Sequence, residues 1–170
     1  MLFDTLLDDI VIPRFVRVRD HRVAERIEDV AAAVRQALDS RGAKEAYFID
    51  SAAVSIKAVR ENLKSTGLEA NARVVNMPFS AFLKSTRAVF DIAILDPPYN
   101  YKIIQKALPH LVEKMSENGV IICEHEKECV LPHDIGRYEI VKVLRHSRTS
   151  VTIYRPKQAD DEDSGKEPEA

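Results

Sequence analysis

The chain has 170 residues, of which 45% are apolar and 31% are charged, and its formal net charge is −2 at pH 7. A chain of this length predicts one domain that can bury a proper hydrophobic core. No apolar run approaches the roughly 20 residues that a membrane-spanning helix needs, and the N-terminus does not resemble a signal peptide. With only two cysteines and no secretion signal, the chain is expected in the cytoplasm.

The charge is unevenly distributed along the chain. Residues 157–170 carry six acids and two lysines, which leaves a net charge of +2 on the rest. We therefore expect a folded domain over residues 1–156 and a disordered acidic tail over 157–170. A body charge of +2 is compatible with an RNA partner but does not by itself indicate one.

The first forty residues predict a helix, a strand and a second helix. Residues 2–10 look like the end of an amphipathic helix, and 14–18 form a β-rich run after Pro13. Arginines alternate through that run, which is unusual for a central strand of a parallel sheet, because both faces of such a strand are normally buried. Residues 22–40 then show apolar spacings of three and four, and Gly42 can end this helix.

The rest of the chain alternates strands and helices. Strands are expected at Glu45–Asp50, Ala72–Asn76, 90–95 and 120–124, with helices after Ser51, at 80–85 and at 103–115. Ser51 can cap the first of these helices, Gly67 can end it, and Asn118-Gly119 is expected to stop the last. Residues 138–144 and 150–154 predict a final antiparallel pair. The expected fold class is α/β, with helices on both faces of a mostly parallel sheet and a C-terminal hairpin.

Asp96-Pro97-Pro98-Tyr99 directly follows the predicted strand at 90–95. Two prolines cannot continue a sheet ladder, so the strand must stop at Asp96 and present the carboxylate and the ring at its carboxyl end. Ligands bind at that edge in open α/β sheets. An ordinary strand-ending turn is the alternative, since Asp and Pro are common turn residues.

A planar ring that bears an amine, such as a nucleobase, fits this four-residue motif. Tyr99 can stack on the face of the base. Asp96 and a proline carbonyl can accept both hydrogens of the exocyclic amine, which orients its nitrogen for attack and stabilises the charge that develops there. The motif therefore predicts a catalytic site for modification of a base amine.

Between residues 42 and 154 the chain resembles the RsmD-like family of class I methyltransferases. The resemblance rests on Ser40-Arg41-Gly42-Ala43, Tyr47-Phe48-Ile49-Asp50, Arg60-Glu61-Asn62-Leu63, Ala72-Arg73-Val74-Val75-Asn76, Phe82-Leu83, Phe90-Asp91, Asp96-Pro97-Pro98-Tyr99 and the strand end at Glu124. It implies transfer of a methyl group from S-adenosylmethionine (AdoMet) to the exocyclic amine of a guanine in 16S ribosomal RNA. The implied partner is ribosomal RNA or the small ribosomal subunit. An adenine-amine methyltransferase is the enzymatic alternative, because the same four-residue motif serves that chemistry.

The resemblance also suggests two cofactor-binding residues. Asp50 matches the acidic residue that binds the ribose hydroxyls of AdoMet, and a carboxylate at a strand end can accept hydrogen bonds from a vicinal diol. An exposed loop acid or a helix cap is the alternative for Asp50. Asn76 ends the third strand near where the adenine would lie, and it is equally well read as a turn residue.

The N-terminal part departs from the family. Residues 14–38 contain no glycine, and Arg19-Asp20-His21-Arg22 stands where the family has its glycine-rich cofactor turn. Glycine is needed there because a Cβ would clash with the cofactor. Pro78 also replaces an acid that contacts the adenine amine. Three interpretations stay open: a divergent enzyme with another cofactor loop, a first part replaced by a frameshift or misassigned start, and an inactive relative that at most binds RNA.

Three smaller patterns remain in the sequence. Cys123, His125, Cys129 and His133 have a spacing that is not a usual zinc pattern, and a buried thiol is the simpler interpretation of Cys123, so no metal is predicted. Glu124 and Glu126 flank the same strand end as a possible general base or as solvated acids. Basic residues cluster near the final hairpin, where they can contact phosphates or form a solvated face: Lys142, Arg145, His146, Arg148 and Arg155.

Overall fold

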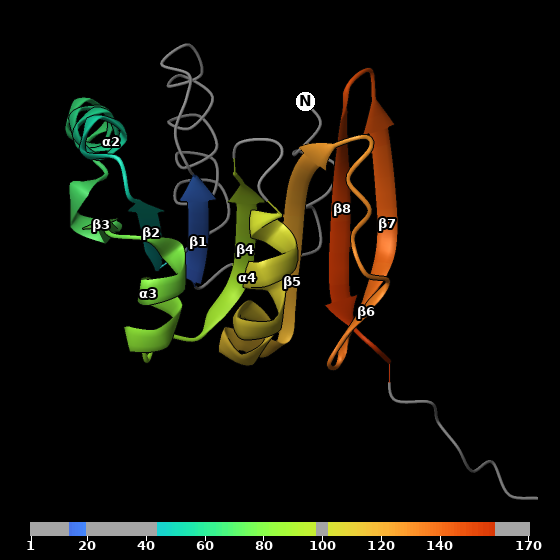
Figure 1. The fold of residues 1–170 in the computed structure, drawn as a ribbon. Coiled ribbons are helices and arrows are strands. Elements are labelled where there is room, and N and C mark those ends of the chain that lie inside the picture. The colour runs from blue at the N-terminus through green and yellow to red at the C-terminus, as the bar shows by residue number, and fades with distance from the viewer. Residues whose placement is uncertain (1–13, 20–43, 98–101, 159–170) are drawn as a thin grey trace, which may run out of the picture.

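The computed structural model describes residues 14–19, 44–97 and 102–158 (Figure 1). In this part of the chain, eight strands form one sheet in the order β3-β2-β1-β4-β5-β8-β7-β6. The strands are β1 (Arg14–Arg19), β2 (Glu45–Asp50), β3 (Ala72–Asn76), β4 (Phe90–Asp96), β5 (Met115–Glu126), β6 (Asp134–Ile135), β7 (Tyr138–His146) and β8 (Thr149–Pro156). The helices are α2 (Ala53–Thr66), α3 (Phe79–Ser85) and α4 (Ile103–Leu111), with 3-10 turns η3 (Glu69–Asn71) and η4 (Val112–Lys114). The predicted helices at 2–10 and 22–40 lie outside the described residues.

The sheet has a parallel half and an antiparallel half. β3, β2, β1, β4 and β5 run parallel, whereas β8 pairs antiparallel with both β5 and β7. β1 pairs with β2 on one side and β4 on the other, through Val16↔Tyr47 and Val16↔Ala93. The strand with alternating arginines is therefore central. The order reverses between β1 and β4, which is the topological switch point of a doubly wound sheet.

Helices cover both faces of the sheet, as predicted. On one face α3 and α4 contribute Phe82 and Leu108 to a core cluster, and Figure 1 draws both helices in front of the strands. On the other face α2 contributes Leu63 to a second cluster with Phe48 and Ile94. Side chains alternate across each strand, so consecutive residues enter opposite clusters. Both layers of core draw buried residues from β2, β4, β5 and β8.

Two predicted element ends were wrong. Asn118-Gly119 was expected to stop a helix, but α4 ends at Leu111 and β5 already begins at Met115. The first part of β5 has more residues than the part of β4 that it pairs with, and a shift in the β4–β5 register accommodates them. Phe90 pairs with Met115, whereas Ile92 pairs with Val120. Tight packing favours glycine at position 119, because a Cβ there would lie 3.0 Å from Met115 Cε and 3.0 Å from Tyr138 Oη.

Ser51 does not cap α2. The N-cap position is Ala52, with no side-chain capping bond, and the Asp50 carboxylate instead accepts a hydrogen bond from the Ala52 N–H. The C-terminal prediction is confirmed, since Gly67 adopts a left-handed conformation with φ 72°. At the other end of the domain, Lys157 donates its N–H to the Arg137 carbonyl and pairs with Asp134. Lys157, which was expected in the disordered tail, is therefore held by the hairpin, and residues 159–170 lie outside the description.

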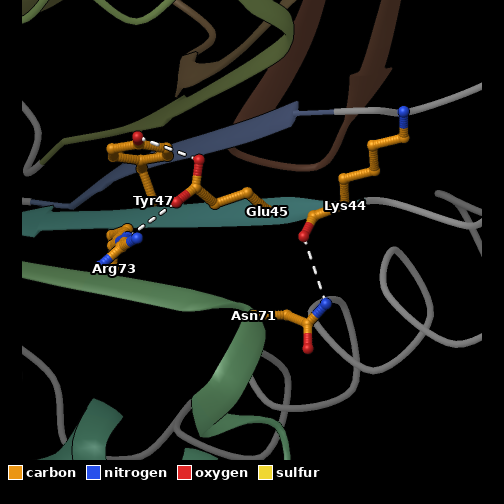
Figure 2. Close-up of polar contacts among 5 residues, drawn as sticks. All are labelled: Lys44, Glu45, Tyr47, Asn71 and Arg73. Carbon is orange, nitrogen blue, oxygen red and sulfur yellow. Dashed lines mark hydrogen bonds and ion pairs between the residues drawn. The ribbon is translucent and has the colours of Figure 1, made fainter.

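Polar side chains tie the strands together where β2 and β3 begin (Figure 2). Glu45 accepts hydrogen bonds from Arg73 Nε at 2.7 Å and from the Tyr47 hydroxyl at 3.1 Å. Nearby, Asn71 Nδ2 donates to the Lys44 carbonyl at 3.2 Å. We call this side of the sheet, where the parallel strands begin, the amino edge. The opposite side, where they end, is the carboxyl edge.

Candidate active site at the carboxyl edge

The carboxyl edge gathers the ends of β2, β1 and β4. Asp50 is the last residue of β2 and Asp96 is the last residue of β4. β1 lies between them and ends at Arg19, which the register places beside Asp96. Two strand spacings separate β2 from β4, so their backbones lie roughly 10 Å apart. Asp50 and Asp96 thus stand on either side of the switch point, where ligands bind in such sheets.

Both carboxylates belong to the same face of the sheet. Ala46 and Phe48 of β2 and Ile92 and Ile94 of β4 enter the core cluster on the α2 side. Because side chains alternate along a strand, Asp50 and Asp96 project from that face too. Glu124 of β5 follows Cys123, the register partner of Leu95, so it lies beside Asp96. The carboxyl edge therefore presents hydrogen-bond acceptors along one face.

Asp50 is rigidly placed. Its side chain is only 4% exposed, and its Oδ1 accepts the Ala52 N–H at 2.7 Å. Its backbone carbonyl accepts a hydrogen bond from Asn76 Nδ2 at 3.0 Å. The exposed-loop alternative for Asp50 is therefore wrong, and its bond to the Ala52 N–H lies just before α2 and is not a side-chain cap of that helix. A buried carboxylate at this strand end also has the chemistry that a ribose diol requires, so the residue fits the sugar of a nucleoside cofactor.

Asn76 ends β3 and is exposed. Its amide nitrogen donates one N–H to the Asp50 carbonyl, which leaves the second N–H and the side-chain carbonyl oxygen as the groups that can bind a ligand. Pro78, two residues later, occupies the N-cap position of α3, and its carbonyl accepts the Phe82 N–H at 3.1 Å. Asn76 thus supports the neighbouring strand end while remaining accessible.

Of the four-residue motif, the structure describes only Asp96 and Pro97. β4 ends at Asp96 as predicted, with Asp96 half-buried and Pro97 buried. Pro98 and Tyr99 lie outside the described residues, so the roles of the second proline and of the aromatic ring stay predictions. The structure brings Asp50, Asn76, Asp96 and Pro97 to one edge of the sheet.

The cysteine and histidine pattern forms a buried polar contact. His125 is 7% exposed, with Nδ1 2.8 Å from the Glu126 carbonyl and Nε2 2.8 Å from Thr152 Oγ1. A carbonyl beside Nδ1 requires the proton on that nitrogen, so a neutral ring accepts the Thr152 hydroxyl at Nε2. Cys123 is fully buried, and burial raises the pKa of its thiol. Within residues 44–97 and 102–158, no three potential ligands gather around a metal position.

Strand order 3-2-1-4-5 with a closing antiparallel hairpin, and carboxylates at the ends of β2 and β4, define a class I methyltransferase fold. A profile of the family described as "conserved hypothetical protein 95" matches residues 32–155. The chain belongs to this family, which is the RsmD-like family that its motifs resemble.

Two relatives are similar in sequence. "Putative rRNA methyltransferase YlbH" of Bacillus subtilis is 30% identical over 122 residues, which cover 68% of this chain and 66% of the relative. "Ribosomal RNA small subunit methyltransferase D" of Haemophilus influenzae is 29% identical over 121 residues, which cover 68% of this chain and 61% of the relative. The matched part of the chain spans less than two thirds of either relative.

Solved structures support the fold. A "putative methylase" from Haemophilus influenzae superposes with a TM-score of 0.72 at 23% identity, covering 92% of this chain and 94% of that one. A "putative sam-dependent methyltransferase" from Streptococcus mutans gives a TM-score of 0.67 at 18% identity, covering 91% and 47%. None of the helices in the described residues is both long and apolar enough to cross a membrane.

Proposed function

We propose that the chain is an AdoMet-dependent methyltransferase that modifies the exocyclic amine of a guanine in 16S ribosomal RNA, in the cytoplasm. One observation carries the proposal: Asp50 and Asp96 end two strands that flank the switch point and project from the same face. One carboxylate is placed for a donor nucleoside and the other for an acceptor base. Membership of the RsmD-like family and the relatives named as ribosomal RNA methyltransferases support the same substrate class.

On the donor side, Asp50 would accept hydrogen bonds from the ribose hydroxyls of AdoMet, and Asn76, its register partner one strand further, would contact the adenine. When bound, AdoMet supplies an electrophilic methyl group. The bond between Asn76 Nδ2 and the Asp50 carbonyl keeps both strand ends in place before the cofactor arrives.

On the acceptor side, Asp96 and the Pro97 carbonyl accept the two hydrogens of the base amine. This pairing would orient the nitrogen lone pair for the methyl group of bound AdoMet and stabilise the positive charge that the nitrogen gains. The new N–C bond would form as the S–C bond of AdoMet breaks, S-adenosylhomocysteine would leave, and the nitrogen would release its proton to water at this edge. A base inside a helix cannot reach this edge, so the target nucleotide must be flipped or unpaired, and Tyr99 is proposed to stack on it.

The lack of glycine between residues 14 and 38 favours a second candidate, a relative that binds RNA without catalysis. The two functions differ in cofactor binding. Titration calorimetry with AdoMet, followed by transfer of a labelled methyl group to 16S ribosomal RNA, separates them. The proposed enzyme binds AdoMet and labels the RNA, whereas absence of binding at millimolar AdoMet would refute the enzymatic function of this chain.

The same experiment also tests which base receives the methyl group. Digestion of the labelled RNA to nucleosides and mass spectrometry should give N2-methylguanosine. Recovery of N6-methyladenosine would contradict the guanine assignment and support the adenine-amine alternative, while leaving the methyltransferase assignment intact.

A further inference from the structure

Five exposed cations lie beside the candidate active site, in three separate segments of the chain. We call them the basic rim: Lys102, Lys106, Lys127, Arg145 and Arg148. Lys102 immediately precedes α4 and Lys106 lies one turn into it, Lys127 follows β5, and the two arginines flank the turn between β7 and β8.

The antiparallel pairing brings the β7–β8 turn to the carboxyl edge. Glu126, the last residue of β5, pairs with Thr149, the first residue of β8. Arg145 of β7 pairs with Ser150 of β8. β5 is parallel to β4 and ends at the same edge as Asp96. In Figure 1 the turn accordingly lies at the same end as the arrowheads of β4 and β5.

Two hydrogen bonds connect the three segments. The Lys127 N–H donates to the Arg148 carbonyl at 3.2 Å, which joins the end of β5 to the hairpin. Gln105 Nε2, in the first turn of α4, donates to the Val130 carbonyl at 3.2 Å, which joins α4 to the loop after β5. These bonds link the start of α4, the loop after β5 and the hairpin along the carboxyl edge, where β4 ends at Asp96; α4 packs on the face opposite to the one from which Asp96 projects.

The charges of the rim are not neutralised by side chains of the described residues. Within residues 44–97 and 102–158, each ion pair formed by a lysine or arginine involves Lys57, Arg73 or Lys157, and no rim side chain takes part in an ion pair or hydrogen bond. Residues 102–106, 126–128 and 145–148 contain two acids, Glu126 and Glu128, against five cations, which leaves a net charge of +3. The whole chain, by contrast, has a net charge of −2.

We propose that the basic rim binds the phosphate groups of RNA next to the target nucleotide. This inference rests on the proposed function. Unpaired guanidinium and ammonium groups at an exposed edge bind phosphates through charge-assisted hydrogen bonds, and arginine does so with two parallel bonds. Such contacts set the position of the RNA, while base contacts give specificity. The rim therefore holds the backbone while Asp96 receives the base.

The test compares a variant of the rim with a variant of the same strand. Arg145→Gln together with Arg148→Gln removes two rim charges without removing any side-chain contact of the described residues. Arg155→Gln is the matched control, because Arg155 is also exposed and unpaired but lies near the other end of β8, at the amino edge. Arg145→Lys with Arg148→Lys keeps both charges, and thermal melting checks that all variants fold.

The measured quantity is the dissociation constant for transcribed 16S ribosomal RNA between 50 and 200 mM KCl. The double Gln variant should bind on the order of tenfold more weakly, with a salt slope shallower by about 1.5, because roughly two phosphate contacts are lost. The Lys variant should retain most of the binding, and the Arg155 variant all of it. AdoMet affinity should not change.

Each of the remaining outcomes shows whether the basic rim or the proposed methyltransferase function fails. Unchanged RNA affinity and salt slope in the double Gln variant would overturn the rim while leaving the methyltransferase intact. Rim-dependent binding to phosphatidylglycerol vesicles, with RNA affinity unchanged, would assign the surface to lipid and overturn the proposal too. A wild-type chain that binds RNA through the rim but neither binds AdoMet nor transfers methyl groups would refute the proposed function alone.

Discussion

The two edges of the sheet differ in how their charged side chains are paired. At the amino edge, acids pair with neighbouring side chains, although Arg155 is unpaired: Glu45 bonds Arg73 and Tyr47, and Asp134 bonds both His133 and Lys157. At the carboxyl edge, the cations of the basic rim have no partner among the described side chains, and the neighbouring strand ends carry carboxylates. The comparison separates residues that hold the strands together from residues that are placed for a ligand.

The comparison predicts two kinds of variant. Changes at the carboxyl edge should reduce binding or transfer and leave stability nearly intact. Changes at the amino edge should reduce stability and leave ligand affinity nearly intact.

The largest effect is expected from Asp96→Ala. Removing the acceptor that orients the base amine should lower the methyl-transfer rate about 1,000-fold or more, because the stabilisation of the developing charge is lost. The affinity for AdoMet, measured by calorimetry, should stay within about twofold. Parallel loss of transfer and of AdoMet binding would contradict the role given to Asp96.

Asp50→Ala should act on the donor side. Loss of hydrogen bonds to a charged acceptor should weaken AdoMet binding roughly 10- to 100-fold. Because Asp50 also accepts the Ala52 N–H, the melting temperature must be recorded beside the affinity. Asp134→Ala, an acid at the amino edge, is the control and should bind AdoMet like the wild type; an equal loss in both variants would argue against a specific contact.

At the amino edge, Gly119→Ala should destabilise the fold. The added methyl group meets Met115 Cε and Tyr138 Oη at 3.0 Å and the Ser116 carbonyl at 3.1 Å, so the surrounding side chains must move. We expect a loss of about 1–3 kcal/mol in the free energy of unfolding, measured with urea. Glu117→Ala, at an exposed position of the same strand, should change it little. Equal effects would show that packing around Gly119 is not tight.

The smallest effect is expected from Asp134→Asn. Lys157 and His133 lower the pKa of the Asp134 carboxyl below its ordinary value of 3.8. Its contribution to stability is therefore present above pH 3.8 and is lost as pH falls through the lower folded pKa. The melting temperatures of wild type and variant should differ slightly at pH 7, and the difference should vanish in strong acid or at high salt. A difference that persisted in acid would not come from this ion pair.

Two strands of the parallel half were the most predictable elements of the molecule. β2 and β3 have the bounds that the sequence predicted, because short β-rich segments flanked by turn residues leave few alternatives. β4 ends at Asp96 because a proline cannot continue the ladder. The placement of Asp96 at the carboxyl edge follows from that local chemistry and from the parallel order of the strands.

Features decided by tertiary contacts were not predictable. Gly119 looked like a helix terminator, although neighbouring side chains from β5 and β7 require the glycine. The bond from Asn76 to the Asp50 carbonyl depends on the β2–β3 register. The sequence predicted only part of the basic rim, namely the arginines near the final hairpin. Lys102, Lys106 and Lys127 come close to these arginines through the antiparallel pairing and the contacts of the loop after β5, which the sequence did not reveal.

The central place of β1 has a consequence for the order of folding. Its residue Val16 pairs with Ala93, a contact of large sequence separation, whereas β7 and β8 are joined by a tight turn. Contacts between distant residues form late, because a long loop must close first. We expect pulsed hydrogen exchange to protect the amides of β5, β7 and β8 before those of β1. Until β1 inserts, the edges of β2 and β4 are unpaired, so the two halves of the substrate site meet only when this last strand is in place.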